Sequence, residues 1–417
     1  MTELRTPASR RGTNLPKMGD FNLTVILDTI RRSPNGLSRV ELAGLVGLSP
    51  QTISNISRRL LDQGLIVEAG KAGVGPGKPR TILRLNPSGM YAVGVHVDPA
   101  VISFSVLDLT GKVVLDSKID TPEAGEPTAV MAAIVFEVQR LIEESGVDPA
   151  KLTGLGVAAP GPIDLDAGTV VNPPLLEGWT RVHLRDALSK ATGLPVVLDK
   201  DVTAAAVAET WVAGDNASSN FGVFYMGTGI GCGLVLNDEV FRGASGNAGE
   251  MGHIVVDPEG PPCDCGLNGC VKSTVIPRVL VDAGAKAGLV EPLTEGDSGV
   301  VVQERFNKLC DAADGGNEDA IAILDRSALH LSRAVSVIAN AMDLDRVVFG
   351  GPFWTRLAPY YLNRVPEQVA HGADARDIHV PQVVGSRVGE DVGAIGAACL
   401  VLEHALAPRS ERLLLGG

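Results

Sequence analysis

The segments YAVGVHV (residues 91–97), VISFSVL (101–107) and KVVL (112–115) predict three consecutive β-strands, which decide the fold of most of the chain. Each is short and rich in β-branched residues, and Asp108–Gly111 supplies the turn between the last two. The same strand–turn–strand pattern returns in FGVFY (221–225), GCGLVL (231–236) and VFR (240–242). Because the pattern occurs twice, the sequence predicts two lobes with similar cores and a ligand cleft between them.

Other short apolar segments alternate with helical ones. GLGVA (154–158), PVVL (195–198) and VVF (347–349) predict strands, and a long helix runs through residues 330–342 before the last of them. This alternation is typical of a mixed α/β fold. A chain of 417 residues also exceeds what one hydrophobic core normally supports, so we expect a multidomain α/β protein.

Composition excludes several classes of protein. With 45% hydrophobic and 20% charged residues, the chain is globular rather than disordered. No apolar run approaches the ~18 residues of a membrane span, and no hydrophobic stretch follows Arg10 and Arg11 to form an export signal. Three of the six cysteines fall within residues 263–270, which favours a metal site in a reducing compartment over a disulfide framework. We therefore expect a cytoplasmic protein without a membrane partner.

The net charge of −13 is unevenly distributed. Residues 1–90 carry 13 Lys and Arg against 6 Asp and Glu, a net of +7, whereas the rest carries 23 against 43, a net of −20. A basic head on an acidic body indicates that the head alone approaches a polyanion. A head that is basic only for solubility is the alternative from charge alone.

The pattern of the head predicts a winged helix-turn-helix over residues 18–86. Apolar positions recur at helical spacing from Phe21 to Ile30, and Ser38 with Glu41 forms a capping box for a second helix, residues 39–46. Ser49 caps a third helix that has Pro50 at its first position. Residues 65–68 and 81–85 predict a hairpin, and the polar, Gly-rich residues 70–80 between them predict its wing.

The outward face of the third helix is polar and suited to the major groove of double-stranded DNA, whereas basic residues of the wing suit phosphates or the minor groove. The predicted contacts are Ser49, Gln51, Thr52, Ser54, Asn55, Arg58 and Arg59 from the helix and Lys71, Lys78 and Arg80 from the wing. One such domain holds a short site weakly, so we expect a homodimer on a two-fold operator, with a tetramer left open. Residues 1–17 are predicted to be a flexible basic arm.

One histidine and three cysteines have the spacing of a metal site. His253 precedes CDCGLNGC (263–270) by ten residues, and one imidazole with three thiolates completes a tetrahedral set for Zn²⁺. No position is left for a catalytic water, so the predicted cofactor is a structural zinc ion. Its ligands would be His253, Cys263, Cys265 and Cys270.

The body resembles the ROK family of repressors and sugar kinases, which has a duplicated, two-lobe actin/hexokinase-like (ribonuclease H-like) fold. The matching motifs are APGP (159–162), GTGIG (227–231), GEMGH (249–253), the cysteine cluster and GAIGAA (393–398). With its winged head, the chain resembles the branch that holds xylose and N-acetylglucosamine repressors. The resemblance implies a first lobe over residues 90–199 plus 393–410, and a second lobe with the zinc site over residues 200–392. It also implies the same four zinc ligands.

The resemblance further implies a sugar-binding cleft. Glu250 and His253 stand on one turn, where a carboxylate and an imidazole can grip adjacent hydroxyls. Asp201 matches the aspartate that accepts the sugar proton in kinases, and a helix N-cap is its alternative role. The candidate sugar-binding residues are Gly161, Lys200, Asp201, Glu250, His253 and Lys272.

Two departures from the family pattern bear on activity. Kinases carry an Asp-x-Gly-x-Thr-like phosphate turn, where this chain has His96, Asp98 and Ala100, with Pro99 removing an N–H. We therefore expect no enzyme activity, with Asp201 vestigial. Lys200 and Lys272 replace an Asn and a Glu, which favours an anionic effector such as a sugar phosphate. The alternative is a neutral sugar, or no ligand at all, with both lysines paired to local carboxylates such as Asp199.

Together these patterns predict a sugar-responsive transcriptional repressor of carbohydrate-related genes. In this hypothesis the ligand closes the cleft and shifts the two DNA-binding heads relative to their half-sites. Two rivals stay open: an active ATP-dependent sugar kinase with an accessory DNA-binding head, and a DNA-binding protein that senses only a partner protein.

Overall fold

The computed structural model describes residues 15–72, 79–122, 126–174, 176, 178–213, 219–294, 296–374 and 377–406. The chain divides into two compact units: residues 1–90 with 108–110 and 402–417, and residues 91–107 with 111–401. Among the helices of the described ranges, none combines the length and apolarity that crossing a bilayer requires.

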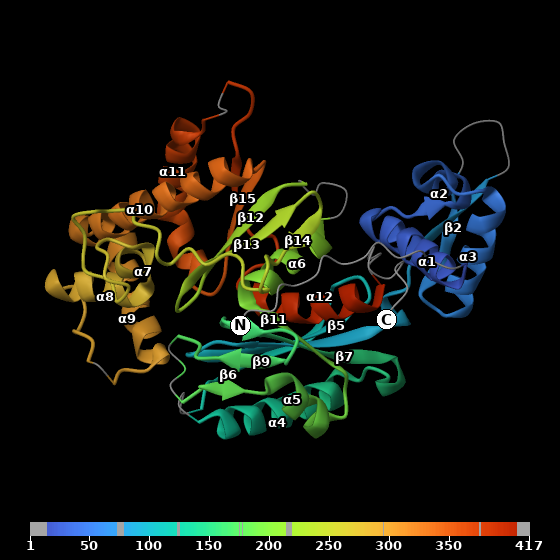
Figure 1. The fold of residues 1–417 in the computed structure, drawn as a ribbon, viewed down its shortest axis with the longest axis horizontal. Coiled ribbons are helices and arrows are strands. Elements are labelled where there is room, and N and C mark those ends of the chain that lie inside the picture. Colours follow the sequence, from blue (N-terminus) through green and yellow to red (C-terminus); the bar gives the residue numbers. More distant parts are fainter. Residues whose placement is uncertain are drawn as a thin grey trace, which may run out of the picture. The chain divides into compact units, whose positions relative to one another are not determined.

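The first unit is a three-helix domain with a small antiparallel sheet (Figure 1). Its helices are α1 (Leu15–Arg32), α2 (Arg39–Val46) and α3 (Pro50–Asp62). Its sheet has the order β1-β3-β2, with β1 at Leu37–Ser38, β2 at Ile66–Ala72 and β3 at Arg80–Leu85. The capping box of Ser38 and Glu41 and the Ser49 cap are both present, which confirms the predicted starts of α2 and α3.

Three details of this unit differ from the prediction. Helix α1 begins at Leu15 rather than Phe21. Pro16 is tolerated in the first turn of a helix, although no apolar periodicity marks this segment. The predicted arm therefore loses its last three residues to α1, and residues 1–14 lie outside the described ranges. Strands β2 and β3 pair as far as Ala72 and Arg80, so the connection between them begins later and ends earlier than the predicted wing of residues 70–80. The polar outward face predicted for α3 implies an apolar inner face of Ile53, Ile56, Leu60 and Leu61. Ile53 and Leu60 are buried, but Ile56 and Leu61 are only half-buried and the polar Ser57 is buried too.

The first lobe of the second unit contains a five-stranded sheet of order β11-β7-β4-β5-β6. Its strands are β4 (Tyr91–Val97), β5 (Val101–Asp108), β6 (Val113–Asp120), β7 (Leu152–Ala159) and β11 (Val196–Lys200). Helices α4 (Pro127–Ser145) and α5 (Leu184–Thr192) pack their buried faces on this sheet. This lobe also contains a smaller sheet of β8 (Ile163–Asp164), β9 (Thr169–Val171) and β10 (Arg181–Val182) and the short 3-10 helix η2 (Pro149–Lys151). A second 3-10 helix, η1 (Pro87–Gly89), belongs to the first unit.

The second lobe repeats this sheet in the order β14-β13-β12-β15-β16. The strands are β12 (Phe221–Met226), β13 (Ile230–Leu236), β14 (Glu239–Phe241), β15 (Arg346–Gly350) and β16 (Gln382–Gly385). In both sheets the first three strands are antiparallel and the next two are parallel additions, so the predicted duplication is confirmed. The remaining helices are α7 (Val271–Thr274), α8 (Pro277–Lys286), α9 (Gly299–Asp314), α10 (Glu318–Met342) and α11 (Trp354–Gly372).

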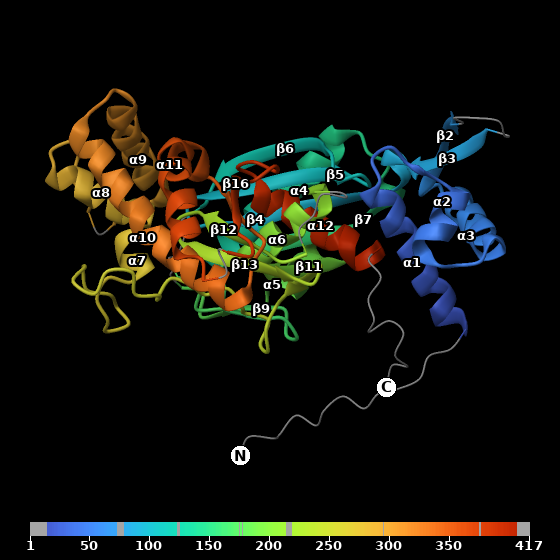
Figure 2. The ribbon, with the colours of Figure 1, turned by 90° about the horizontal axis from the view of Figure 1, so that it is seen from above.

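Two helices lie between the two five-stranded sheets, as Figures 1 and 2 show: α6 (Asp201–Ala213) and α12 (Val392–Leu406). Helix α12 packs closely against both β7 and α6 because a glycine stands at each contact. A β-carbon on Gly156 of β7 would lie 1.7 Å from the Ala397 carbonyl oxygen, and one on Gly396 would lie 2.0 Å from the Ala204 carbonyl oxygen. This packing brings the start of α6, with Asp201, to the carboxyl end of the first sheet, facing the second lobe.

Candidate functional site

The candidate DNA-reading surface is the exposed face of α3. Gln51, Asn55, Arg58 and Arg59 are exposed there, and the Gln51 amide donates to Asn55 Oδ1 at 3.2 Å. The hydroxyls are engaged within the helix itself: Ser49 Oγ and Thr52 Oγ1 lie 2.9 Å apart, and Ser54 donates to the Pro50 carbonyl at 2.8 Å. The surface therefore offers amides and guanidinium groups more than free hydroxyls.

The basic residues around α3 have different surroundings. Arg59 forms an exposed ion pair with Asp20 of α1 at 3.1 Å, which leaves Arg58 as the more available cation of this face. Lys71 and Arg80 lie on the paired ends of β2 and β3 and are exposed. Lys78 lies outside the described residues.

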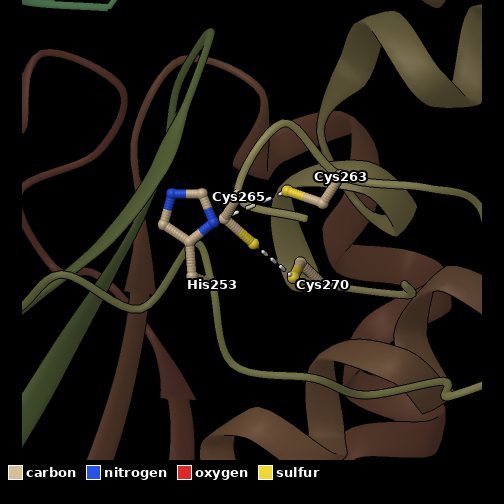
Figure 3. Close-up of side chains that lie close together, drawn as sticks. All are labelled: His253, Cys263, Cys265 and Cys270. Atoms are coloured by element: carbon tan, nitrogen blue, oxygen red, sulfur yellow. Dashed lines mark hydrogen bonds between the residues drawn. The ribbon is translucent and has the colours of Figure 1, made fainter. Parts of the chain in front are cut away.

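The four predicted metal ligands lie together in the second lobe (Figure 3). The Nδ1 of His253 and the Sγ atoms of Cys263, Cys265 and Cys270 all fall within 4.8 Å of one another. Cys263 Sγ is 3.5 Å from His253 Nδ1, and Cys265 Sγ is 3.6 Å from Cys270 Sγ. Ligand atoms of a tetrahedral zinc–thiolate site stand about 3.7 Å apart, so this cluster could hold a metal ion with little movement.

The loop geometry explains why these four side chains meet. The Cys263 N–H donates to Leu267 O at 2.8 Å, and Val255 bridges Cys270 in an antiparallel pairing. Gly269 has a φ of +63°, and a β-carbon there would lie 1.5 Å from the Asp257 carbonyl oxygen, so only glycine allows the loop to close. Burial raises the pKa of the Cys270 thiol to about 12, so a metal ion at this site would have to displace its proton.

The six predicted sugar-binding residues line one cavity of about 470 Å³ between the lobes. This volume is within the range of small-molecule sites. Gly161 and Lys200 come from the first lobe, and Asp201 begins the helix that follows it. The other three belong to the metal loop and its flanks: Glu250, His253 and Lys272. His253 approaches Cys263 through its Nδ1 and also lines the cavity.

Asp201 has the surroundings of a weakly acidic carboxyl group. Burial raises its pKa to about 7, and the negative charges of Asp98 and Glu250 act in the same direction, against the N–H of Val202 and the charge of Lys200. The Val202 N–H donates to Asp201 Oδ1 at 2.7 Å, so the carboxylate accepts a backbone N–H from the first turn of α6 as well as lining the cavity.

Both lysines of the cavity have carboxylate partners. Lys200 is only 2% exposed, and its Nζ contacts the Glu250 carboxylate and the carbonyl oxygens of Asn247 and Ala248. Lys272 Nζ lies 2.5 Å from Asp264 Oδ2. Asp199, which the alternative named as a lysine partner, instead pairs with Arg242 at 2.8 Å. The cavity therefore presents ion pairs rather than free positive charge.

Three residues at this site were missed in the sequence analysis: Asp264, Thr228 and Asn247. Asp264 and Thr228 line the cavity, and Asn247 exchanges two hydrogen bonds with the Ile163 backbone, at 2.7 and 2.9 Å. The position of Asp264 between two thiol ligands was a usable signal, because a loop that curls around an ion turns the intervening side chain outward. No local pattern marks Asn247.

Comparison with known proteins agrees with this architecture. The ROK family model matches residues 92–404, and a winged helix-turn-helix DNA-binding model matches residues 25–67. The chain belongs to the ROK family, and it combines the family's sugar-kinase-like body with an N-terminal winged helix-turn-helix.

Individual relatives fall into both branches of the family. The chain is 26% identical to the xylose repressor of Bacillus subtilis over 92% of this chain and 94% of that one. It is 29% identical to a glucokinase of Halalkalibacterium halodurans, over 76% of this chain and 96% of that one. Among solved structures, a ROK family transcriptional regulator homologous to the E. coli MLC protein matches with a TM-score of 0.75 and 24% identity, over 95% of this chain and 98% of that one. A Streptomyces griseus ROK glucokinase, solved with glucose and AMPPNP, matches with a TM-score of 0.63 and 26% identity, over 74% of this chain and 98% of that one.

Proposed function

We propose that the protein is a transcriptional repressor whose affinity for its operator responds to a small sugar bound between the lobes of its body. The observation that carries this proposal is the presence, in one chain, of an exposed amide- and Arg-bearing α3 and an interlobe cavity lined by hydrogen-bonding groups. The likeness to the xylose repressor over 92% of the chain supports the same reading.

We assign the DNA contacts to residues 18–86 and the ligand cavity to the body, with lobes at residues 90–199 plus 393–410 and at 200–392. The winged domain would act as a homodimer on a two-fold operator, since one domain alone reads a short site. Ligand-dependent movement of the lobes would change DNA affinity by ~5–150-fold, which corresponds to ~1–3 kcal/mol of coupling.

We further propose that the four-residue cluster holds a structural Zn²⁺ ion. The His and three Cys donors suit zinc, and they leave no ligand position for a reacting water. Metal bound at Nδ1 of His253 would fix the proton on Nε2, so that the ring donates a hydrogen bond into the cavity. Thiolate ligation also fits a reducing compartment such as the cytoplasm.

The effector we favour is a neutral sugar rather than a sugar phosphate. Lys200 and Lys272 are each paired with a carboxylate, and Asp98 and Asp201 add acidic groups that no cavity lysine contacts. An anionic ligand would therefore have to break an ion pair or face like charge. We expect calorimetry on a panel of aldoses and their phosphates to find a neutral sugar that binds at least tenfold more tightly than its phosphate. A phosphate that binds more tightly than its parent sugar would reverse this choice.

The second candidate function is an active sugar kinase, and the surroundings of Asp201 are the observation that favours it. A carboxyl with its pKa raised to about 7 suits a general base, and a glucokinase is among the relatives. Against it, the buried Asp98 carboxylate stands in the phosphate turn. We expect no ATP-dependent phosphorylation of any hexose in a coupled ADP-release assay, with a ROK glucokinase as the positive control. Turnover that Asp201→Asn abolishes would establish the kinase.

The test of the proposed function is selection of genomic fragments on the zinc-loaded protein, followed by binding of the best fragment with and without each sugar. A sequence-specific complex that one sugar releases or tightens supports the regulator. If the protein prefers no fragment over bulk DNA, the proposal fails. If it binds a specific fragment that no sugar affects, a regulator that senses a partner protein takes its place.

A further inference from the structure

Asp98 joins the two lobes of the body through its carboxylate. The residue lies in the turn between β4 and β5 of the first lobe and is 7% exposed. Its Oδ1 accepts the N–H of Ala100 at 2.8 Å, and its Oδ2 accepts the hydroxyl of Thr228 at 3.0 Å. Thr228 belongs to the glycine-rich turn between β12 and β13 of the second lobe, 130 residues away in sequence.

Further contacts hold both turns against Asp98. The Thr121 hydroxyl donates to the Asp98 carbonyl at 2.6 Å and fixes the first turn. On the other side, a β-carbon on Gly227 would lie 3.4 Å from Asp98 Oδ2, so the carboxylate packs directly against the glycine backbone. The carboxylate is therefore held by an N–H of one turn and an O–H of the other, which are donors of the kind that bind an anion.

Close packing also joins the Asp98 turn of the first lobe to the second lobe. A β-carbon on Gly299, the first residue of α9, would lie 2.4 Å from the Ala100 β-carbon. At the other end of the cavity, Asn247 of the second lobe holds the Ile163 backbone of the first. Asp98, Thr228 and Gly161 help to line the ligand cavity. The cavity therefore lies between two sets of interlobe hydrogen bonds, one at Asp98 and Thr228 and the other at Asn247 and Ile163.

Behind Asp98 lies a smaller cavity of about 70 Å³, lined by His96, Tyr225, Lys118 and Asp391 among others. His96 Nε2 and the Tyr225 hydroxyl are buried in its wall and have no hydrogen-bond partner among the residues that the structure describes. Buried polar groups without partners favour any movement that lets water reach them. Separation of the lobes at this end would do so, and the bond between Asp98 and Thr228 opposes it.

We propose that Asp98 is an internal anion that latches the two lobes together at Thr228 and thereby controls how readily the ligand cleft opens. The latch takes the place that an exogenous anion would need between the two turns. It acts within the body, so it does not depend on DNA binding or on the identity of the effector.

Hydrogen exchange of the full-length, zinc-loaded protein, followed by mass spectrometry, tests the latch without any ligand. Thr228→Val removes the hydroxyl and keeps the shape of the side chain. We expect it to accelerate exchange about tenfold in the opposite lobe, at the amides of Asp98, Ala100 and Val101, because losing a hydrogen bond to a charged group shifts a local equilibrium by about that factor. Thr228→Ser, which keeps the hydroxyl, should exchange like the wild type.

The design separates the latch from a general loss of stability. Amides in α10, far along the chain from both turns, should keep their wild-type exchange in every variant. If Thr228→Val exchanges faster everywhere, Asp98→Asn is used instead. The asparagine amide keeps an oxygen that can accept the Ala100 N–H, but it carries no charge. Faster exchange in this variant that is confined to residues 98–101 and 227–230 supports the latch. Unchanged exchange at residues 98–101 in Thr228→Val, or faster exchange in Thr228→Ser as well, would overturn the proposal.

Discussion

Cys270→Ser is expected to abolish stoichiometric zinc binding and to lower the free energy of unfolding of the body by more than about 3 kcal/mol. Cys270 is the buried member of the cluster, and the residue after it begins helix α7, so its loss removes a ligand and loosens the start of that helix. The loop also carries Glu250, Asp264 and Lys272, which line the ligand cavity. We therefore expect the variant to lose sugar binding as well.

Metal analysis of the purified protein, denaturant unfolding and calorimetry with the effector measure these three effects. The matched control is Cys310→Ser, which changes an equally buried thiol in α9 away from the cluster. Cys310→Ser should keep its zinc, whatever it loses in stability by placing a hydroxyl in the core. A Cys270→Ser protein that retains one zinc per chain would show that the cluster is not the site.

Arg58→Ala and Asn55→Ala are each expected to weaken binding to the selected operator by ~1–3 kcal/mol, or ~5–150-fold, and to relax its sequence preference. Both side chains are exposed on α3, and Asn55 is oriented by the amide of Gln51. Zinc content and sugar affinity should not change, because these residues belong to a different compact unit from the cavity.

Fluorescence anisotropy at a fixed salt concentration, on operator and scrambled duplexes, measures the loss. Lys71→Ala serves as a contrast on the exposed end of β2: we expect it to weaken both duplexes alike and to reduce the salt slope by about 1. Arg181→Ala, on the surface of the body, should change neither. If Arg58→Ala and Asn55→Ala both bind operator like the wild type, α3 is not the reading helix.

Much of the fold could be predicted because its signals are local. The Ser38 and Ser49 caps, Pro50 at the start of α3 and the β-branched segments of the duplicated sheets act through neighbours a few residues away. The boundary errors arise where the local signal is weak. Strand β6 runs on to Asp120 although its second half is polar, because alternate residues face the solvent along an edge strand. Helix α1 begins in a polar stretch for which periodicity gives no evidence.

The sequence by itself determined the winged head, the two similar lobes, the cluster of one histidine and three cysteines, and the group of residues around the cavity. Each of these depends on spacing along the chain, which a sequence records directly. Only the tertiary structure decided the charge of the cavity. Lys200 meets Glu250 across 50 residues, Lys272 turns back to Asp264, and Asp98 meets Thr228 across 130 residues. Electrostatic interaction depends on separation in space, so a lysine that indicates an anionic ligand in the sequence is, once folded, already neutralised by its own chain.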